Sequence, residues 1–249
     1  MNLGSLYRSI GEYALLMRMA FSRPERGKVY WRLTVAEVYK LGVQSLGIVA
    51  LLSLFMGAVV TLQTAANIDS GWIPKWTIGF TTRQTMILEF SSTIVCLILS
   101  GKVGSNVASE IGTMRITEQI DALDIMGVNS AGYLILPKII AAVFIFPFLV
   151  MISMSLGITA GAAVGTSTGA ISLTDFEIGL QYYFDTFDVT YTLIKTLFFA
   201  FIITSVSSYH GYYTRGGALE VGQSSTRAVV YSIILIMICN YMLTQIMLL

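Results

Sequence analysis

The sequence predicts an all-α integral membrane protein with an N-terminal interfacial helix, five transmembrane helices and a short cytoplasmic helix between spans two and three. The first observation is composition: 55% of the 249 residues are hydrophobic and only 12% are charged, about half the charged share of a soluble domain. The second is a series of long runs almost free of charge. The third is a charge-dense segment, Gly101–Val128, that separates two very apolar regions.

Five apolar runs account for the spans. Three runs carry no charge, Leu41–Ile68, Ile139–Thr174 and Ala228–Leu249, while Gln84–Gly101 carries only Glu89 and Thr196–Thr214 only His210. A bilayer core needs roughly 20 apolar residues of helix. We therefore expect spans at Gly42–Ala66, Thr85–Gly101, Tyr133–Thr166, Val189–Tyr209 and from Ala228 to the end. The run from Ile139 is long for one span but too short for two spans and a turn.

Residues 1–40 are predicted to form a basic cytoplasmic lead-in, and residues 41–249 the five-span domain. Apolar residues of the first segment recur at helical spacing: Leu3, Leu6, Tyr7, Ile10, Tyr13, Met17 and Phe21. This pattern favours a helix lying in the membrane interface with its cations near lipid phosphates. Packing on the protein itself is the alternative. Pro24 and Gly27 should end this helix, and a second helix should start near Leu33 and enter span one.

Charge placement predicts the orientation. With a cytoplasmic N-terminus, 12 of the 15 Lys and Arg residues lie inside and three lie outside or within span four: Lys75, Arg83 and Lys195. The positive-inside rule therefore predicts a cytoplasmic N-terminus, a periplasmic C-terminus and a cytoplasmic Gly101–Val128 segment. A net charge of +1 gives no reason to expect nucleic acid as a partner.

The segment Gly101–Val128 is predicted to contain one amphipathic helix at about residues 109–127. Ile116, Ile120 and Leu123 recur at helical spacing and share one face, and three carboxylates share another: Glu118, Asp121 and Asp124. Gly112 and Gly127 stand near its ends. An ordinary solvated loop is the alternative that the residues alone leave open.

Several polar groups fall inside apolar spans, where they need protein or water as partners. Gln63, Thr64 and Asn67 cluster near the outer end of span one. Glu89 is a turn or two inside span two, either in a substrate path or in a structural ion pair. Lys195 lies at a similar depth in span four, so it could pair with Glu89 or extend to the outer surface.

A glycine series marks span three. Gly157, Gly161 and Gly165 stand four residues apart, on one helical face. Small residues at this spacing let another helix approach closely. The contact could be an interface between subunits or internal packing.

The sequence shows no catalytic residues that fit a known pattern. A phosphate-binding loop is missing, because Val103 follows Gly101-Lys102 and the upstream glycine is absent. The single histidine, His210, excludes a serine triad elsewhere, and Cys96 and Cys239 have no metal-ligand spacing and lie in apolar spans. We expect a non-catalytic chain without cofactor or metal, which takes part in transport that another protein drives.

Two blocks carry a family resemblance. The first runs from Gly101 through Glu110-Ile-Gly-Thr-Met-Arg-Ile-Thr-Glu-Gln-Ile-Asp-Ala-Leu-Asp-Ile-Met-Gly-Val128, and the second includes Leu193-Ile-Lys195, Thr214-Arg-Gly-Gly-Ala218 and Thr226-Arg-Ala-Val-Val230. Both closely resemble the MlaE (YrbE) permeases, the membrane subunits of Mla/Mce-type ABC lipid transporters. The similarity extends from about Val35 to the end. Leu88 and Ser92 depart from it, since many members have Arg and Pro there.

The resemblance implies a homodimer, a cytoplasmic ABC ATPase dimer, an outer MCE-domain protein that is usually hexameric and, in some members, a STAS-domain subunit. It implies a coupling role for the helix between spans two and three, with ATPase contacts at Glu110, Arg115, Glu118 and Asp121. It also implies a phospholipid cavity with lining positions at Val60, Gln63, Asn67, Ile68, Glu89, Phe90 and Lys195.

The expected function is that of the permease of a phospholipid transporter. A bacterial inner membrane is expected over a plastid envelope, because no Ser- and Arg-rich transit segment precedes the fold. The transported lipid would pass between that membrane and the MCE tunnel toward the outer membrane. The alternative is an autonomous channel or intramembrane enzyme that uses Glu89 and Lys195. Co-purification of an ATPase and an MCE protein would distinguish the two.

Overall fold

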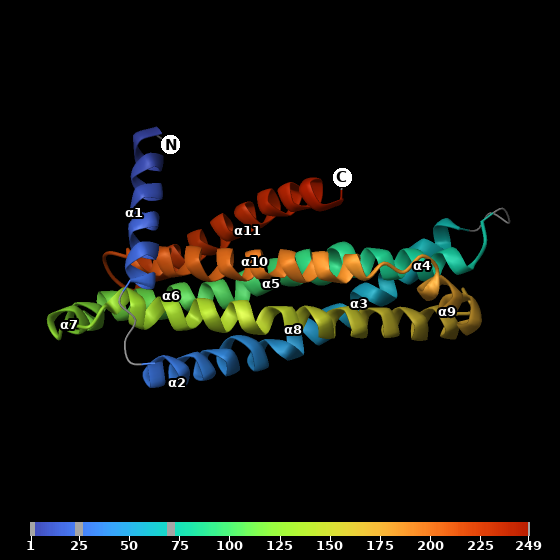
Figure 1. The fold of residues 1–249 in the computed structure, drawn as a ribbon, viewed down its shortest axis with the longest axis horizontal. Coiled ribbons are helices and arrows are strands. Elements are labelled where there is room, and N and C mark those ends of the chain that lie inside the picture. Colours follow the sequence, from blue (N-terminus) through green and yellow to red (C-terminus); the bar gives the residue numbers. More distant parts are fainter. Residues whose placement is uncertain (1–2, 23–26, 69–72, 249) are drawn as a thin grey trace. The chain divides into compact units, whose positions relative to one another are not determined.

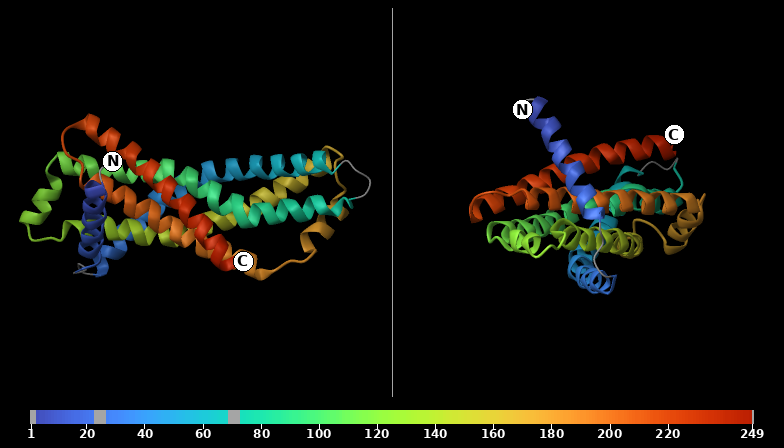
Figure 2. Two further views of the ribbon diagram at one scale, coloured as in Figure 1. Left: turned by 90° about the horizontal axis from the view of Figure 1, so that it is seen from above. Right: turned by 60° about the vertical axis from the view of Figure 1, so that its left-hand side comes forward.

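The computed structural model describes residues 3–22, 27–68 and 73–248. The described residues are 89% helical and contain no strand (Figures 1 and 2). The first eight helices are α1 (Leu3–Phe21), α2 (Gly27–Val38), η1 (Tyr39–Val43), α3 (Gln44–Asn67), α4 (Trp76–Thr85), η2 (Met86–Ile94), α5 (Val95–Leu99) and η3 (Ser100–Gly104). They are followed in the described residues by α6 (Ser105–Ile116), α7 (Gln119–Ile125), α8 (Ser130–Ser167), α9 (Leu173–Gln181), α10 (Thr186–Tyr212) and α11 (Ala218–Leu248). The η segments are π-helices.

Among the described residues, five helical stretches are long and apolar enough to cross a membrane, as the sequence predicts. They are Gly27–Asn67, Trp76–Ile116, Ser130–Ser167, Thr186–Tyr212 and Ala218–Met247. Several bounds differ from the prediction. The first stretch starts at Gly27 and not near Leu33, and the second is longer at both ends than Thr85–Gly101. Charged residues within it, such as Arg83 and Glu110, find partners inside the protein, so charge did not mark the ends of this helix.

The helices form two compact units, each described here by itself. Unit 1 comprises Met1–Val43, Leu99–Ile145 and Phe198–Cys239, and unit 2 comprises Gln44–Ile98, Phe146–Leu197 and Asn240–Leu249. The chain passes from one unit to the other within helical stretches, and no linker separates the units.

In unit 1, α1 stands across the end of α10 (Figure 1). The Tyr13 hydroxyl donates to Ser205 Oγ at 2.9 Å. At the other end of α1, the Asn129 side-chain amide donates to the carbonyls of Met19 and Ser22. Packing on the protein, the alternative to an interfacial position, therefore holds for one face of α1, with Leu16, Met17 and Ala20 buried. Tyr7 and Ile10 of the predicted apolar stripe are exposed.

In unit 2, α3 and α8 touch at their backbones. A Cβ atom at Gly57 would collide with the Gly157 carbonyl, and one at Gly161 would meet Thr61 Oγ1. Ser53 Oγ donates to Ser153 Oγ at 2.7 Å beside this contact. Of the two roles open for the span-three glycines, internal packing is the one observed within this chain.

The prediction of one helix over residues 109–127 is wrong. The segment forms two helices, α6 and α7, because Glu118 has φ +59° and breaks the helix after Thr117. Gly112 lies inside α6, against Thr214 and Val221. Gly127, at φ +77°, does end α7: its N–H bonds to the Asp124 carbonyl and that of Val128 to Leu123, the Schellman pattern that a glycine in this conformation permits.

Candidate functional site

Glu89 and Lys195 form an ion pair in unit 2. Lys195 Nζ lies 3.2 Å from Glu89 Oε1 and 3.1 Å from the Leu88 carbonyl. The Lys195 side chain is fully buried, while that of Glu89 is 43% exposed. Extension of Lys195 to the surface, one sequence alternative, is thus excluded. A buried ammonium is costly without a carboxylate partner, so Glu89 stabilises Lys195 and still presents an accessible carboxylate.

Side chains from three helices surround the pair. Glu89 Oε2 accepts from Thr93 Oγ1 at 2.9 Å and from Asn240 Nδ2 at 3.3 Å. The Lys195 ammonium lies 4.9 Å from the ring centre of Tyr191, whose hydroxyl bonds to Thr244. The sequence reading missed Thr93, Tyr191 and Asn240. Asn240 could have been found, since a carboxamide in an uncharged span requires a polar partner.

A π-helix presents Glu89. Residues Met86–Ile94 form η2, and the Val95 N–H bonds to the Phe90 carbonyl five residues earlier. Such wide turns are rare and often occur at functional sites. The Leu88 carbonyl and the Glu89 carboxylate, from successive residues of η2, both accept a hydrogen bond from the Lys195 ammonium.

The other predicted lipid-contacting residues lie on α3, directly after it (Ile68) and on η2. Val60 is buried, Gln63 and Asn67 are exposed on the same α3 face, and Phe90 is half-buried. Ile68 packs against the cluster of Ile78, Ile171 and Phe176. Within the described residues, no hydrogen bond or ion pair joins Gln63 or Asn67 to Glu89 or Lys195. The structure thus brings together only Glu89 and Lys195 from this predicted set.

The α6–α7 turn forms a second candidate site, in unit 1. Arg115 Nη1 bonds to Asp121 Oδ1 at 2.7 Å across the turn, and its guanidinium lies over the Tyr212 ring. Glu118 is exposed at the turn itself. Ile120 is fully buried and anchors α7 to the protein. The turn therefore presents carboxylates on a fixed backbone.

Glu110, on α6, lies in an ion-pair network. Its Oε2 accepts from Lys40 Nζ at 2.5 Å and from Lys138 Nζ at 2.9 Å. Lys138 is buried and also bonds Glu37 at 2.6 Å. The carboxylate of Glu110 thus joins α6 directly to η1 and α8, and Lys138 extends the network to Glu37 on α2.

Two apolar side chains at the end of α7 are exposed to an unusual degree. Ile125 is 88% exposed and Met126 68%. The sequence reading considered only the charges here and missed both. The pattern that could have identified them is an apolar pair placed after the last carboxylate of α7 and directly before a helix-ending glycine, where no face of the helix remains to bury it.

No group of three or more His, Cys, Asp or Glu side chains in the described residues lies close enough to hold a metal ion. His210 stacks on the Tyr231 ring at 5.2 Å, and Cys96 is buried as a free thiol.

Comparison with known proteins places these features in a family. The family described as Permease MlaE matches residues 34–246. A probable ABC transporter permease protein of Rickettsia bellii is 35% identical over 240 residues, covering 96% of this chain and 92% of the relative. The chloroplastic protein TRIGALACTOSYLDIACYLGLYCEROL 1 of Arabidopsis thaliana is 32% identical over 88% of this chain and 63% of its own length. The intermembrane phospholipid transport system permease protein MlaE of Haemophilus influenzae is 27% identical over 97% and 92%.

With a match across nearly all of its length, five helices able to span a membrane and ionic groups held within them, this chain is a multi-pass membrane protein that belongs to the MlaE permease family.

Proposed function

We propose that this chain is the permease subunit of an ABC transporter that moves phospholipid between the bacterial inner membrane and an MCE-protein tunnel toward the outer membrane. A separate ATPase dimer would supply the energy. The name of the Haemophilus relative, an intermembrane phospholipid transport system permease protein, supports phospholipid as the cargo. The observation that carries the proposal is the Glu89–Lys195 pair, because an accessible carboxylate within an apolar span suits a lipid headgroup.

The lipid site would combine this pair with apolar and amide groups. Glu89 would contact the headgroup directly, while Lys195 would hold the carboxylate in position. The tails would lie along Val60, Ile68 and Phe90, and Gln63 and Asn67 would add hydrogen bonds to the headgroup. Two copies of the chain would together enclose this lipid site. Only 11% of the residues in the most apolar stretch of α11 are buried within one chain, which leaves surface for a second copy.

Energy would enter through the α6–α7 turn. Arg115, Glu118 and Asp121 are exposed or half-exposed there, and the apolar pair Ile125–Met126 adds contact area for an ATPase. Glu110 would pass a movement of α6 to α2 and α8 through Lys138. An MCE-domain hexamer would receive the lipid on the opposite side, and a STAS-domain subunit would accompany the ATPase in some systems.

In the proposed transporter the N-terminus of the chain would be cytoplasmic and its C-terminus periplasmic. The excess of Lys and Arg among the residues of unit 1 supports it.

The first test is gentle purification of the tagged chain in nanodiscs, followed by mass spectrometry of bound proteins and lipid. The proposal expects an ATPase, an MCE protein and about one phospholipid per cavity. The Glu89→Gln variant should keep both protein partners and lose most of the lipid. A chain that purifies without partner or lipid would instead favour the channel or enzyme alternative.

A further inference from the structure

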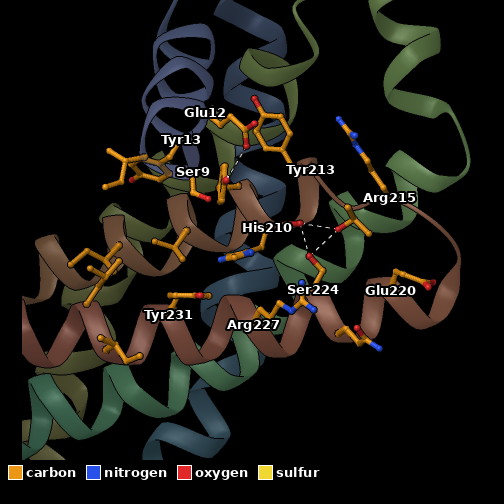
Figure 3. Close-up of a pocket in the computed structure, with 18 residues that line it drawn as sticks. Ser9, Glu12, Tyr13, His210, Tyr213, Arg215, Glu220, Ser224, Arg227 and Tyr231 are labelled. Carbon is orange, nitrogen blue, oxygen red and sulfur yellow. Dashed lines mark hydrogen bonds between the residues drawn. The ribbon is translucent and has the colours of Figure 1, made fainter. Parts of the chain in front are cut away.

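A cavity of about 990 Å³ lies entirely within unit 1, between α1, the end of α10 and the start of α11 (Figure 3). Its volume is at the upper end of the range for small-molecule sites. None of its lining residues belongs to the Glu89–Lys195 pair or to the α6–α7 turn. Neither headgroup binding at the pair nor ATPase contact at the turn therefore uses this cavity.

One end of the cavity carries two arginines, Arg215 and Arg227. Arg215 is close enough to Glu12 for its charge to help lower the pKa of that carboxyl, and in the described part of the chain no hydrogen bond or ion pair engages the Arg227 guanidinium. Two carboxylates are also present, but both are engaged. Glu12 is bound by Arg8 at 2.8 Å, and this hydrogen bond lowers the pKa of Glu12. Glu220 accepts the Gly217 N–H at 2.9 Å. When Arg8 is counted with Arg215 and Arg227, three guanidiniums stand beside these two carboxylates, so the net charge at this end of the cavity is positive.

Hydrogen bonds fix the walls at this charged end. Ser224 Oγ donates to the His210 carbonyl, and Thr214 Oγ1 donates to Ser224 Oγ at 2.9 Å. About two turns further along α11, the Tyr231 ring stacks on the His210 ring. These contacts hold α10 and α11 in antiparallel register, with Arg227 beside His210 in Figure 3.

The opposite end is apolar. Moving into the two spans from the charged end, the lining residues become Val206 and Ile202 on α10 and Ile234 and Leu235 on α11. Arg227 and Leu235 are eight residues apart on one helix, so roughly 12 Å separates the two ends. Charged groups lie where both spans end, and aliphatic groups lie within them. This polarity matches that of a membrane lipid.

We propose that this cavity binds one anionic phospholipid. Arg227 and Arg215 would contact the phosphate, the Tyr213 and Tyr231 rings would flank the headgroup, and an acyl chain would lie along Val206 and Ile234. A free phosphate would leave the apolar half of the cavity unfilled, which is why we assign a lipid. The assignment depends only on α10 and α11 spanning the membrane and is independent of the transport proposal.

The test uses the full chain, with any subunits that co-purify, in nanodiscs of phosphatidylcholine with a minor share of phosphatidylglycerol. Native mass spectrometry counts the lipids retained. Arg227→Gln should lower retained phosphatidylglycerol roughly tenfold, the loss expected for one charge-assisted hydrogen bond, and leave phosphatidylcholine unchanged. Arg227→Lys should keep much of the retention. Arg32→Gln is the matched control, since Arg32 is an exposed arginine of unit 1 outside the cavity.

Three results would overturn the proposal. An equal loss in Arg227→Gln and Arg32→Gln would mean that general surface charge attracts the lipid. Full displacement of phosphatidylglycerol by inorganic phosphate would mean a site for free anions. A photo-crosslinker at Tyr231 that captures a protein segment in place of lipid would mean that the cavity is a docking site for a second copy or a partner. Unchanged thermal unfolding midpoints would verify that the variants are folded.

Discussion

The ammonium of Lys195 and the carboxylate of Glu89 lie 3.2 Å apart, although 106 residues separate them in the chain. The two halves of the pair differ in environment, because Lys195 is fully buried and Glu89 is 43% exposed. Removal of Glu89 should therefore affect stability differently from removal of Lys195. Loss of the carboxylate leaves a buried charge, whereas loss of the ammonium leaves a carboxylate that water or lipid headgroups can reach.

We predict that Glu89→Leu destabilises the protein by about 3 kcal/mol and Lys195→Met by less, on the order of 1 kcal/mol. The double variant should recover most of the stability, since no unpaired charge remains. Thermal unfolding in detergent measures this order. If Lys195→Met proves the more harmful change, the assignment of the buried charge is wrong. Lipid transport should stay lost in the stable double variant, which separates a functional role from a structural one.

Sequence reasoning predicted the pairing as one of two options because charged residues inside apolar spans have few ways to avoid an unpaired state. It did not predict the network around the pair. Thr93 stands four residues after Glu89, a spacing that helical periodicity does bring together. Asn240 contacts Glu89 only because α11 lies beside η2, which periodicity does not predict. The break at Glu118 was missed for a related reason: the apolar spacing of Ile116, Ile120 and Leu123 fits one continuous helix, and glutamate rarely adopts positive φ.

The close approach of α3 and α8 depends on Gly57 and Gly157. We predict that Gly57→Ala costs about 3 kcal/mol or more, because its methyl group would collide with backbone atoms of α8 and not with a side chain that can move. For a domain of this size the midpoint should fall by roughly 6–12 °C. Gly47→Ala on the same helix is the control. It meets no atom within 4 Å and should raise stability by ~0.5–1 kcal/mol. Similar losses in both variants would argue against the backbone contact.

Glu118 combines a left-handed backbone with an exposed charge, and two substitutions separate these features. Asn tolerates positive φ, so Glu118→Asn should keep the turn and remove the charge, whereas Glu118→Lys reverses the charge. If the side chain contacts an ATPase, both variants should fold, Glu118→Asn should weaken ATPase co-purification and Glu118→Lys should abolish transport. Normal ATPase binding and transport by Glu118→Lys would rule out the coupling role.

The exposed pair Ile125 and Met126 predicts an apolar contact with the same partner. Changing both to Ser should leave the free energy of unfolding within about 0.5 kcal/mol of the parent, because neither side chain is buried. ATPase retained after purification should nevertheless drop at least tenfold, as expected for an interface anchor. Leu173→Ser provides the control, since Leu173 is 56% exposed in unit 2. Equal loss of ATPase in the control would mean that the effect is not specific to α7.

Arg83 illustrates how a charge can be accommodated without a carboxylate in direct contact. Its buried guanidinium donates to the carbonyls of Leu180, Tyr182 and Tyr183, where α9 ends, and lies over the Phe80 ring. Arg83→Lys keeps the charge but loses the planar fork of donors, so we predict a loss of about 2 kcal/mol and faster proteolysis between α9 and α10. Lys75→Gln, at an exposed position of unit 2, should change stability by less than about 0.5 kcal/mol. If Arg83→Lys behaves like Lys75→Gln, positive charge alone holds the end of α9, and the fork geometry contributes nothing measurable.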